Sequence, residues 1–480
     1  MLFNSIDFAI FFPVFFVLYW IVARKLTLRN ILILLGSYIF YAWWDWRFLF
    51  LIIFSSIVDF LVGLKISKAE SKLLKKRFLL LSLFTNLCLL AYFKYTNFFI
   101  DSFINSFRFF GAELDSFSLN IILPVGISFY TFQTLSYTID IYRGRLEPTK
   151  NWLAFFSFVA FFPQLVAGPI ERASHLLPQF FRTYSFDYKL FKSGALLVGF
   201  GLFKKMVIAD RLAIVVNEVY SSPSGHSGQD LIVATVFFAF QIYCDFSGYS
   251  DIAIGLARTM GFDLMKNFDT PYFAKSITDF WRRWHISLST WFRDYVYIPL
   301  GGSRKGEYRV YLNLFIVFVV SGLWHGAAFT FIIWGAIHGL IIVAEKAFGN
   351  YNMIIKRNGF VRGLLFTLTT FTIVCFAWIF FRANSISDSI VIIQNLLNFD
   401  SNLKSIYNLG LPSHELDLGI IAVVLLLIFD AVHRKYNAIR LLNKAPLVLR
   451  SAFYVSIVFA IIIFGIYGDD SVSEFIYFQF

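Results

Sequence analysis

The residue best suited to chemistry in this chain is a histidine among small residues, in the segment Ser321-Gly-Leu-Trp-His-Gly-Ala-Ala328. This residue, His325, lies inside an apolar run from about Tyr311 to Val343. Burying an ionisable ring in hydrocarbon is costly, so such a residue is a functional-site candidate by default, and small neighbours leave room for another molecule. The alternative is that His325 donates one hydrogen bond between helices and performs no chemistry.

A second histidine, His285, lies in an aromatic pattern about forty residues upstream. Residues at the helical spacing of three and four form one face there. The members of this face are Trp281, Trp284, His285, Leu288, Trp291 and Phe292. Arg282, Arg283 and Arg293 fall off the stripe, so the pattern predicts one amphipathic helix that lies in the membrane interface or re-enters the bilayer. Packing under a bundle explains the tryptophans, but His285 breaks the apolar character of the face.

Four other residues are candidates for supporting roles. His338 follows His325 by thirteen residues, or about 220° around an ideal helix, so we expect it to pack or to support another residue. Trp324, directly before His325, is a further supporting candidate. Asp245 and Asp251 could orient a histidine, but six residues correspond to about 240°. We therefore expect each carboxylate to cap or pair locally, and not to form a paired-carboxylate site.

The composition is that of a polytopic membrane protein. Hydrophobic residues make up 58% of the 480 residues and charged residues 15%, and the mean hydropathy is +0.68, which excludes an ordinary soluble globule. A spanning helix needs about 20 apolar residues. Apolar runs lie near residues 8–23, 31–44, 48–64, 78–92, 121–142, 152–167, 194–219, 231–257, 310–324, 327–348, 364–381, 418–432 and 452–467. These runs are longer than β-barrel strands, so we predict an all-α fold with about 11–13 transmembrane helices.

The net charge of +12 is concentrated in short loops beside the apolar runs. This is the positive-inside pattern and does not indicate nucleic-acid binding. The basic residues of the first three such loops are Arg24, Lys25 and Arg29, then Lys65, Lys68, Lys72, Lys75, Lys76 and Arg77, then Arg143, Arg145 and Lys150. Simple alternation of the first five helices places all three loops in the cytoplasm and the amino terminus outside. Beyond residue 167 the topology is not predicted, because Lys204, Lys205 and Arg211 interrupt an apolar stretch.

Other site types are not indicated. Cys88, Cys244 and Cys375 stand singly, with no disulfide or zinc spacing. There is no Walker loop, dinucleotide fingerprint or HExxH pattern, so we expect no metal and no tightly bound cofactor. The first apolar run has no basic leader and no small-residue cleavage site, and we expect it to be a retained helix. Without an internal repeat of fixed period, we expect one membrane domain over residues 1–480.

Several strings of this sequence together resemble the signature of the membrane-bound O-acyltransferase superfamily, and specifically its bacterial alginate O-acetylase branch. They are Trp281-Arg-Arg-Trp-His-Ile-Ser-Leu-Ser-Thr-Trp-Phe-Arg-Asp-Tyr-Val-Tyr-Ile-Pro-Leu-Gly-Gly302, Ser321-Gly-Leu-Trp-His-Gly326, Leu123-Pro-Val-Gly-Ile-Ser-Phe-Tyr-Thr-Phe-Gln133, Phe161-Phe-Pro-Gln-Leu-Val-Ala-Gly-Pro-Ile170, Gln241-Ile-Tyr-Cys-Asp-Phe-Ser-Gly-Tyr-Ser-Asp251 and Phe475-Ile-Tyr-Phe-Gln-Phe480. The resemblance runs nearly from end to end. It implies tilted helices ringed around a narrow central pore, with re-entrant or interfacial helices and funnels that meet near a catalytic histidine.

The resemblance also assigns roles to the two histidines. His325 matches the essential histidine of the family, and His285 matches an upstream position that is occupied by His, Asn or Asp. Transfer of an acetyl group from a thioester to an alcohol needs a base and donors that hold the oxyanion. A neutral imidazole suits the first task, because its unperturbed pKa of about 6.5 lies near working pH. We therefore predict that His325 is the base and that His285 orients the substrate or donates to the developing charge.

Four cations are candidates for binding the phosphates of coenzyme A. Arg282, Arg283, Arg304 and Lys305 surround the expected approach to the site, and the planar guanidinium suits phosphate oxygens. The alternative is ordinary positive-inside bias with contact to anionic lipid.

The function expected from the resemblance is membrane O-acetyltransfer from a cytoplasmic donor, acetyl-CoA being the first choice, for an extracytoplasmic polysaccharide. Alginate, cellulose and peptidoglycan are modified by similar systems, and a separate periplasmic acetyltransferase is a common partner in this branch. The expected location is the bacterial inner membrane. Two alternatives stay open: transfer of D-alanine from a carrier protein to a teichoic acid, and a proton-coupled transporter or channel.

Overall fold

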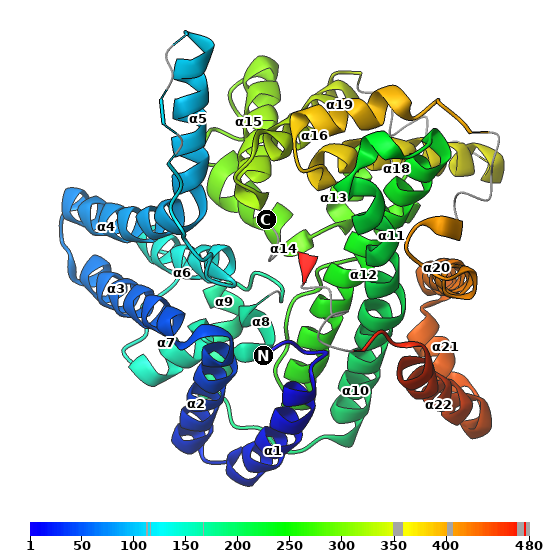
Figure 1. Cartoon of the computed structure of the whole chain (residues 1–480). Helices are drawn as coiled ribbons and strands as arrows, with labels where there is room; N and C mark the ends of the chain where they lie inside the picture. Colours follow the sequence, from blue (N-terminus) through cyan, green and yellow to red (C-terminus); the bar gives the residue numbers. More distant parts are fainter. Residues whose placement is uncertain are drawn as a thin grey trace. The chain divides into compact units, whose positions relative to one another are not determined.

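Every regular element in the described part of the chain is a helix (Figure 1). The computed structural model describes residues 1–111, 114–115, 117–166, 168–348, 359–400, 407–467 and 475–476. Within these ranges there is no β-strand. The prediction of an all-α fold is therefore confirmed.

Eight stretches of the described chain are long and apolar enough to cross a membrane. They are Leu26–Lys68, Lys72–Arg108, Gly228–Thr259, Glu307–His325, Phe329–Ala347, Phe360–Arg382, Ser413–Tyr436 and Leu447–Phe464. The chain is thus a multi-pass membrane protein, as the composition predicts. Other predicted runs form shorter or interrupted helices, such as the 17 residues of α1 (Ile6–Val22), so the count of 11–13 stays a prediction.

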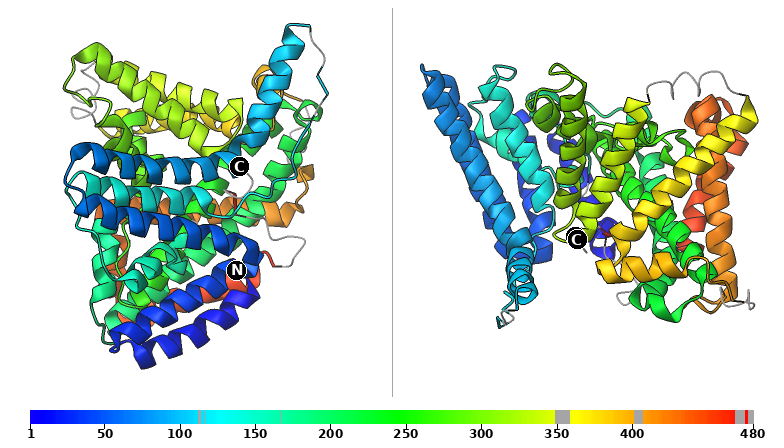
Figure 2. Two further views of the ribbon diagram at one scale, coloured as in Figure 1. Left: turned by 90° about the vertical axis from the view of Figure 1, so that its left-hand side faces the viewer. Right: turned by 90° about the horizontal axis from the view of Figure 1, so that it is seen from above.

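The structure divides into two compact units, the first of which comprises Met1–Leu197 and Ile252–Met265. Its elements are α1 (Ile6–Val22), α2 (Leu26–Asp45), η1 (Trp46–Phe48), α3 (Leu49–Lys68), α4 (Lys72–Leu90), η2 (Ala91–Tyr95), α5 (Thr96–Phe109), α6 (Ile127–Tyr142), α7 (Trp152–Val159), α8 (Phe162–Leu165), α9 (Ala173–Leu176) and η3 (Leu177–Phe181). Figure 2 shows α2, α3 and α4 running side by side. The expectation of a single domain stays a prediction.

Buried polar side chains join the helices of the first unit. The fully buried carboxylate of Asp59 on α3 accepts hydrogen bonds from Ser82 Oγ at 2.6 Å and Asn86 Nδ2 at 3.0 Å, both on α4. Arg29 corrects one prediction, because it lies on α2 with no exposed surface and not in a basic loop. Its guanidinium donates to the Phe180 carbonyl at 3.0 Å and packs over the Tyr184 ring. A buried charge needs such partners.

The second unit comprises Val198–Asp251 and Lys266–Phe480. Its elements are η4 (Phe203–Ala209), α11 (Asp210–Ser221), η5 (Pro223–Gly225), η6 (Pro271–Phe273), α13 (Ile277–Arg283), α14 (Ile286–Phe292), η7 (Arg293–Tyr297), α15 (Glu307–His325), α16 (Phe329–Ala347), α18 (Phe360–Arg382), α19 (Ile386–Asn395), α20 (Ser413–Tyr436), α21 (Ala438–Lys444) and α22 (Leu447–Phe464). Two further helices, α10 (Tyr188–Leu202) and α12 (Gly228–Thr259), contribute residues to both units.

The helices α15 and α16 form a tight hairpin, which fixes the end of α15. A Cβ atom added at Gly322 would lie 2.2 Å from the Phe331 carbonyl oxygen, and one added at Gly335 would lie 2.3 Å from that of Phe318. Only glycine allows two helix backbones to approach this closely. His325, the last residue of α15, is therefore held in a defined position.

The topology prediction can be tested at Ser71, which is exposed at the start of α4. In a Cys88→Ser background, which removes the exposed native cysteine, we expect Ser71→Cys to react with a membrane-impermeant maleimide only after cell lysis. This follows because the basic loop should remain in the cytoplasm. The matched control is Ser118→Cys, also exposed and expected on the outside. Labelling of Ser71→Cys in intact cells would show that the orientation is the reverse of the predicted one.

Candidate active site

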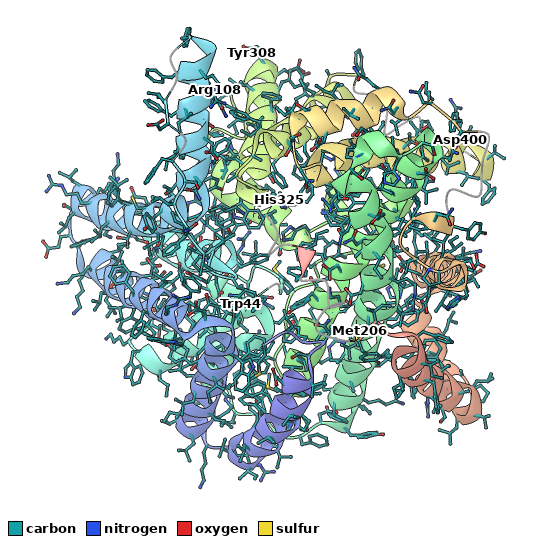
Figure 3. The ribbon with its side chains drawn as sticks, in the orientation of Figure 1. Trp44, Arg108, Met206, Tyr308, His325 and Asp400 are labelled. Carbon is teal, nitrogen blue, oxygen red and sulfur yellow. The ribbon has the colours of Figure 1, made fainter. Side chains whose placement is uncertain are left out.

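His325, labelled in Figure 3, is the last residue of α15. Aromatic rings surround its imidazole. Its ring centroid is 5.0 Å from those of Trp324 and Trp334 and 5.5 Å from that of Phe381. The side chain is 2% exposed, and Gly326 follows directly in extended backbone. The cage keeps bulk water away from the imidazole.

His285 lies at a break between two short helices, which corrects the prediction of one amphipathic helix. The helix α13 ends at Arg283 and α14 begins at Ile286. Between them, His285 has a φ of 44°. This left-handed conformation is unusual for a residue with a Cβ atom and costs on the order of 1–3 kcal/mol. Such strained residues cluster at active sites.

Asn267 holds this turn and was not predicted as a site residue from the sequence. Its backbone carbonyl accepts a hydrogen bond from Ile286 N at 2.9 Å. Its side-chain oxygen accepts from Ser287 N at 3.2 Å and from Ser287 Oγ at 2.9 Å, and its amide donates to Ser250 Oγ at 3.1 Å. A buried asparagine with both ends of its amide bonded can offset the strain at His285. No local sequence signal links residue 267 to 285.

The two predicted catalytic histidines come together. The ring centroids of His285 and His325 are 6.2 Å apart, and Trp324 lies 5.0 Å from the second ring and 6.1 Å from the first. Phe246 on α12 packs edge-on against His285 at 4.6 Å. Burial lowers the pKa of His285, which lies outside the eight membrane-crossing stretches, and so favours the neutral ring.

His338 is near the pair but separated from it. The prediction of an angle of about 220° from His325 is wrong, because the helix does not continue between them and α16 starts anew at Phe329. The ring of Trp334 lies between the two, 5.0 Å from His325 and 5.1 Å from His338. His338 also stacks on Phe280 and meets Trp281 edge-on. These contacts agree with a packing role.

The two candidate carboxylates on α12 are bound by neighbouring lysines. Lys205 Nζ lies 2.8 Å from Asp245 and 2.7 Å from Asp210, all buried, and Lys204 Nζ lies 2.5 Å from Asp251. Both lysines belong to the π-helix η4. Each carboxylate therefore pairs locally, as the spacing predicts. Asp245 also accepts a hydrogen bond from the backbone N–H of Ile476 at 2.8 Å, while residues 477–480 of the terminal motif lie outside the described residues.

The second unit contains a cavity of about 390 Å³ whose lining includes none of the three histidines. Its lining residues are Ser276, Thr278, Trp281, Arg282, Leu288, Ser289, Phe292, Arg293, Tyr297, Leu314, Val317, Phe318, Ser321, Ile342, Glu345 and Lys346. The exposed cations Arg282, Arg293 and Lys346 mark its open end. Buried Trp281 and Ser321 mark its inner end, and Ser321 is one helical turn before His325.

Of the four cations predicted to bind phosphate, one lines the cavity and three do not. The lining residue is Arg282. Arg283 does not line it and forms an ion pair with Asp279 at 2.9 Å. Arg304 and Lys305 are exposed in the turn before α15 and are also absent from its lining. Arg293 and Lys346 also line the cavity and were not predicted, because their position beside Arg282 depends on how η7 and α16 pack.

Comparison with known proteins agrees with this geometry. The family model for MBOAT, the membrane-bound O-acyltransferase family, matches residues 148–387, which include both histidines and the whole cavity. The chain belongs to the membrane-bound O-acyltransferase family. The resemblance inferred from the two histidine segments is thereby confirmed, and the chain is an acyltransferase.

Relatives within the membrane-bound O-acyltransferases narrow the chemistry. The chain is 41% identical to the "probable alginate O-acetylase AlgI" of Pseudomonas aeruginosa over 91% of this chain and 82% of the relative. It is 35% identical to the peptidoglycan O-acetyltransferase of Helicobacter pylori over 81% of this chain and 78% of the relative. It is 28% identical to the teichoic acid D-alanyltransferase of Bacillus subtilis over 55% of this chain and 69% of the relative. The chain is thus similar to proteins named for the O-acetylation of alginate and of peptidoglycan.

The catalytic assignment predicts an order among the histidine variants. General-base assistance is worth about 10²–10⁴-fold in rate, so His325→Ala should abolish measurable O-acetylation while the protein still inserts and accumulates. His285→Ala should impair acetylation strongly, and His338→Ala should have the smallest effect because Trp334 separates its ring from His325. The measurement is the acetyl content of the exported polymer beside the protein level in the membrane. Retention of more than about a tenth of wild-type acetylation by His325→Ala would leave that residue a packing role only.

Proposed function

We propose that this protein is an inner-membrane O-acetyltransferase that takes acetyl from acetyl-CoA in the cytoplasm and passes it to a polysaccharide outside. The observation that carries the proposal is the pair of buried imidazoles, 6.2 Å apart, in a chain of the acyltransferase family. A cavity with a cationic entrance reaches Ser321, one helical turn before His325. The relatives that acetylate alginate and peptidoglycan support the polysaccharide class.

The cavity suits a donor that is anionic at one end and small and apolar at the other. Arg282, Arg293 and Lys346 can bind phosphate oxygens at the entrance. Arg293 keeps N–H donors beyond its contact with Asp294. The one carboxylate of the lining, Glu345, accepts hydrogen bonds from the backbone N–H groups of residues 277 and 278 at the start of α13. Its carboxylate is therefore held against the start of α13 by these bonds, and the lining carries three cations against one carboxylate.

The histidines then supply the acid–base chemistry. His325 accepts the proton of the acceptor hydroxyl as its oxygen attacks the thioester carbonyl carbon. His285, or a water that it orients, donates to the oxyanion that develops. The C–S bond breaks, and the departing thiolate takes up the proton from His325. The product is an acetyl ester and free coenzyme A, so no oxidant or metal is consumed.

The acceptor hydroxyl belongs to the exported polysaccharide or to a periplasmic acetyltransferase that passes the acetyl group on. A gene cluster for an exported polysaccharide and its acetyltransferase next to this gene would support the second route. The D-alanyltransferase relative covers little more than half of this chain. Turnover with a carrier-protein thioester and none with acetyl-CoA would favour D-alanyl transfer and overturn the proposal.

The cationic entrance makes a kinetic prediction. Replacing Arg282, Arg293 and Lys346 by Gln should raise the KM for acetyl-CoA more than it lowers kcat, because phosphate contacts far from the reacting bond bind ground state and transition state alike. The matched control is Arg304→Gln with Lys305→Gln, which removes exposed charge that does not line the cavity. Equal effects of the two sets would show that general charge near the membrane is responsible, and not a phosphate site.

A further inference from the structure

The helix α5 of the first unit follows a helix that is already long enough to cross the membrane. The apolar stretch that contains both, Lys72–Arg108, has 37 residues, which corresponds to about 55 Å of helix. The hydrocarbon layer is about 30 Å thick, and spanning helices tilt by at most about 40°. The 19 residues of α4 extend about 28 Å and suffice for one crossing. The 14 residues of α5 therefore lie at the membrane surface or beyond it.

The chain changes direction between these two helices. The π-helix η2 interrupts the α-helical bonding pattern, and π-bulges are a cause of kinks. The hydroxyl of Thr96 also donates to the Tyr92 carbonyl at 2.7 Å, a bond that bends helices. Figures 1 and 2 show α5 turned away from the direction of α4. With this kink, α5 can follow the membrane surface after α4 has crossed the bilayer.

The exposed side chains of α5 form an apolar face and a polar face. Phe99, Phe103 and Phe107 are 59%, 59% and 41% exposed and fall within about 80° of an ideal helix. The polar residues of the opposite side are Asp101, Asn105 and Arg108, all of them exposed. A helix with two such faces suits the boundary between lipid headgroups and acyl chains.

The first unit holds α5 in a fixed orientation. Ile104, between the two faces, is only 8% exposed. The side-chain amide of Asn97 donates to the Leu119 carbonyl at 2.9 Å, and its oxygen accepts from the Leu119 N–H at 3.0 Å. Along the chain, the phenylalanine face follows Phe84 of α4 and Tyr92 of η2, which are 69% and 54% exposed. An exposed phenylalanine on a spanning helix contacts lipid, so the phenylalanine face extends a lipid-facing surface.

We propose that α5 lies in the plane of the membrane surface, with its phenylalanine face in the acyl chains of one leaflet and its polar face toward water. The partner of this surface is the bilayer. Because Asp101 and Arg108 carry opposite charges, the contact does not depend on anionic headgroups. By the predicted topology this leaflet is the outer one. The inference is independent of the proposed function, since it concerns the first unit alone.

The test uses spin-labelled cysteine variants of the full-length protein in phosphatidylcholine nanodiscs, in the Cys88→Ser background. Electron paramagnetic resonance measures how often each label collides with oxygen, which concentrates among acyl chains, and with a water-soluble nickel chelate. We expect oxygen to dominate at Phe103→Cys and Phe107→Cys and the chelate to dominate at Asp101→Cys and Asn105→Cys, so that the ratio of the two rates differs several-fold between the faces. Phe84→Cys on α4 is the lipid-exposed reference and should report a greater depth.

The four substituted side chains of α5 are exposed, so the variants should fold as the parent does. Dominance of the chelate at all four positions would overturn the proposal, because α5 would then stand in water with its phenylalanines available to a partner protein. Dominance of oxygen at all four would also overturn it, because α5 would then lie inside the hydrocarbon. An oxygen signal at Phe103→Cys that appears only after addition of phosphatidylglycerol would overturn the apolar basis of the contact.

Discussion

Asn267 holds His285 in a left-handed backbone conformation, and the geometry of the site depends on that turn. A continuous helix from α13 to α14 would carry the ring of His285 elsewhere. The turn costs on the order of 1–3 kcal/mol, and hydrogen bonds to Ile286 and Ser287 offset this at about 1 kcal/mol each. The chain thus keeps local strain where it brings a second imidazole to 6.2 Å from the first.

The other half of the site depends on contact between backbones. Glycines 322 and 335 allow α15 and α16 to touch, so the end of α15 cannot shift without breaking the hairpin. Aromatic rings fill the space that remains, with Trp334 in contact with both His325 and His338. A rigid, dry surrounding of this kind strengthens the electrostatic interactions of an acyl-transfer site.

Some of this arrangement could be predicted from the sequence. Hydropathy indicated the all-α membrane fold, because continuous apolar runs have few other solutions. His325 stood out because its neighbours are small, but the room that Gly322 and Gly326 leave is filled by Phe331 and not by another molecule. The spacing of Asp245 and Asp251 predicted separate partners, and each carboxylate pairs with a different lysine. These features depend on residues that are close together in the chain, so the sequence pattern alone can predict them.

Other features arise only from tertiary structure. The aromatic stripe around His285 reads as one helix, since nothing near residue 285 shows that Asn267 will break it. Arg29 reads as a loop charge, although Phe180 and Tyr184, far along the chain, bury it. The cations at the cavity entrance, Arg282, Arg293 and Lys346, come from three different elements. The prediction from the sequence included Arg304 and Lys305, which do not line the cavity.

The proposed mechanism requires a coenzyme A thioester to bind in the cavity and its acetyl group to reach His325. The most direct measurement is a cryo-EM map of the protein in nanodiscs with a stable thioether analogue of acetyl-CoA. We expect density in the cavity, with phosphates against Arg282, Arg293 and Lys346 and the acetyl mimic at the inner end, directed toward His325. Analogue density elsewhere on the protein, with this cavity occupied by lipid, would contradict it.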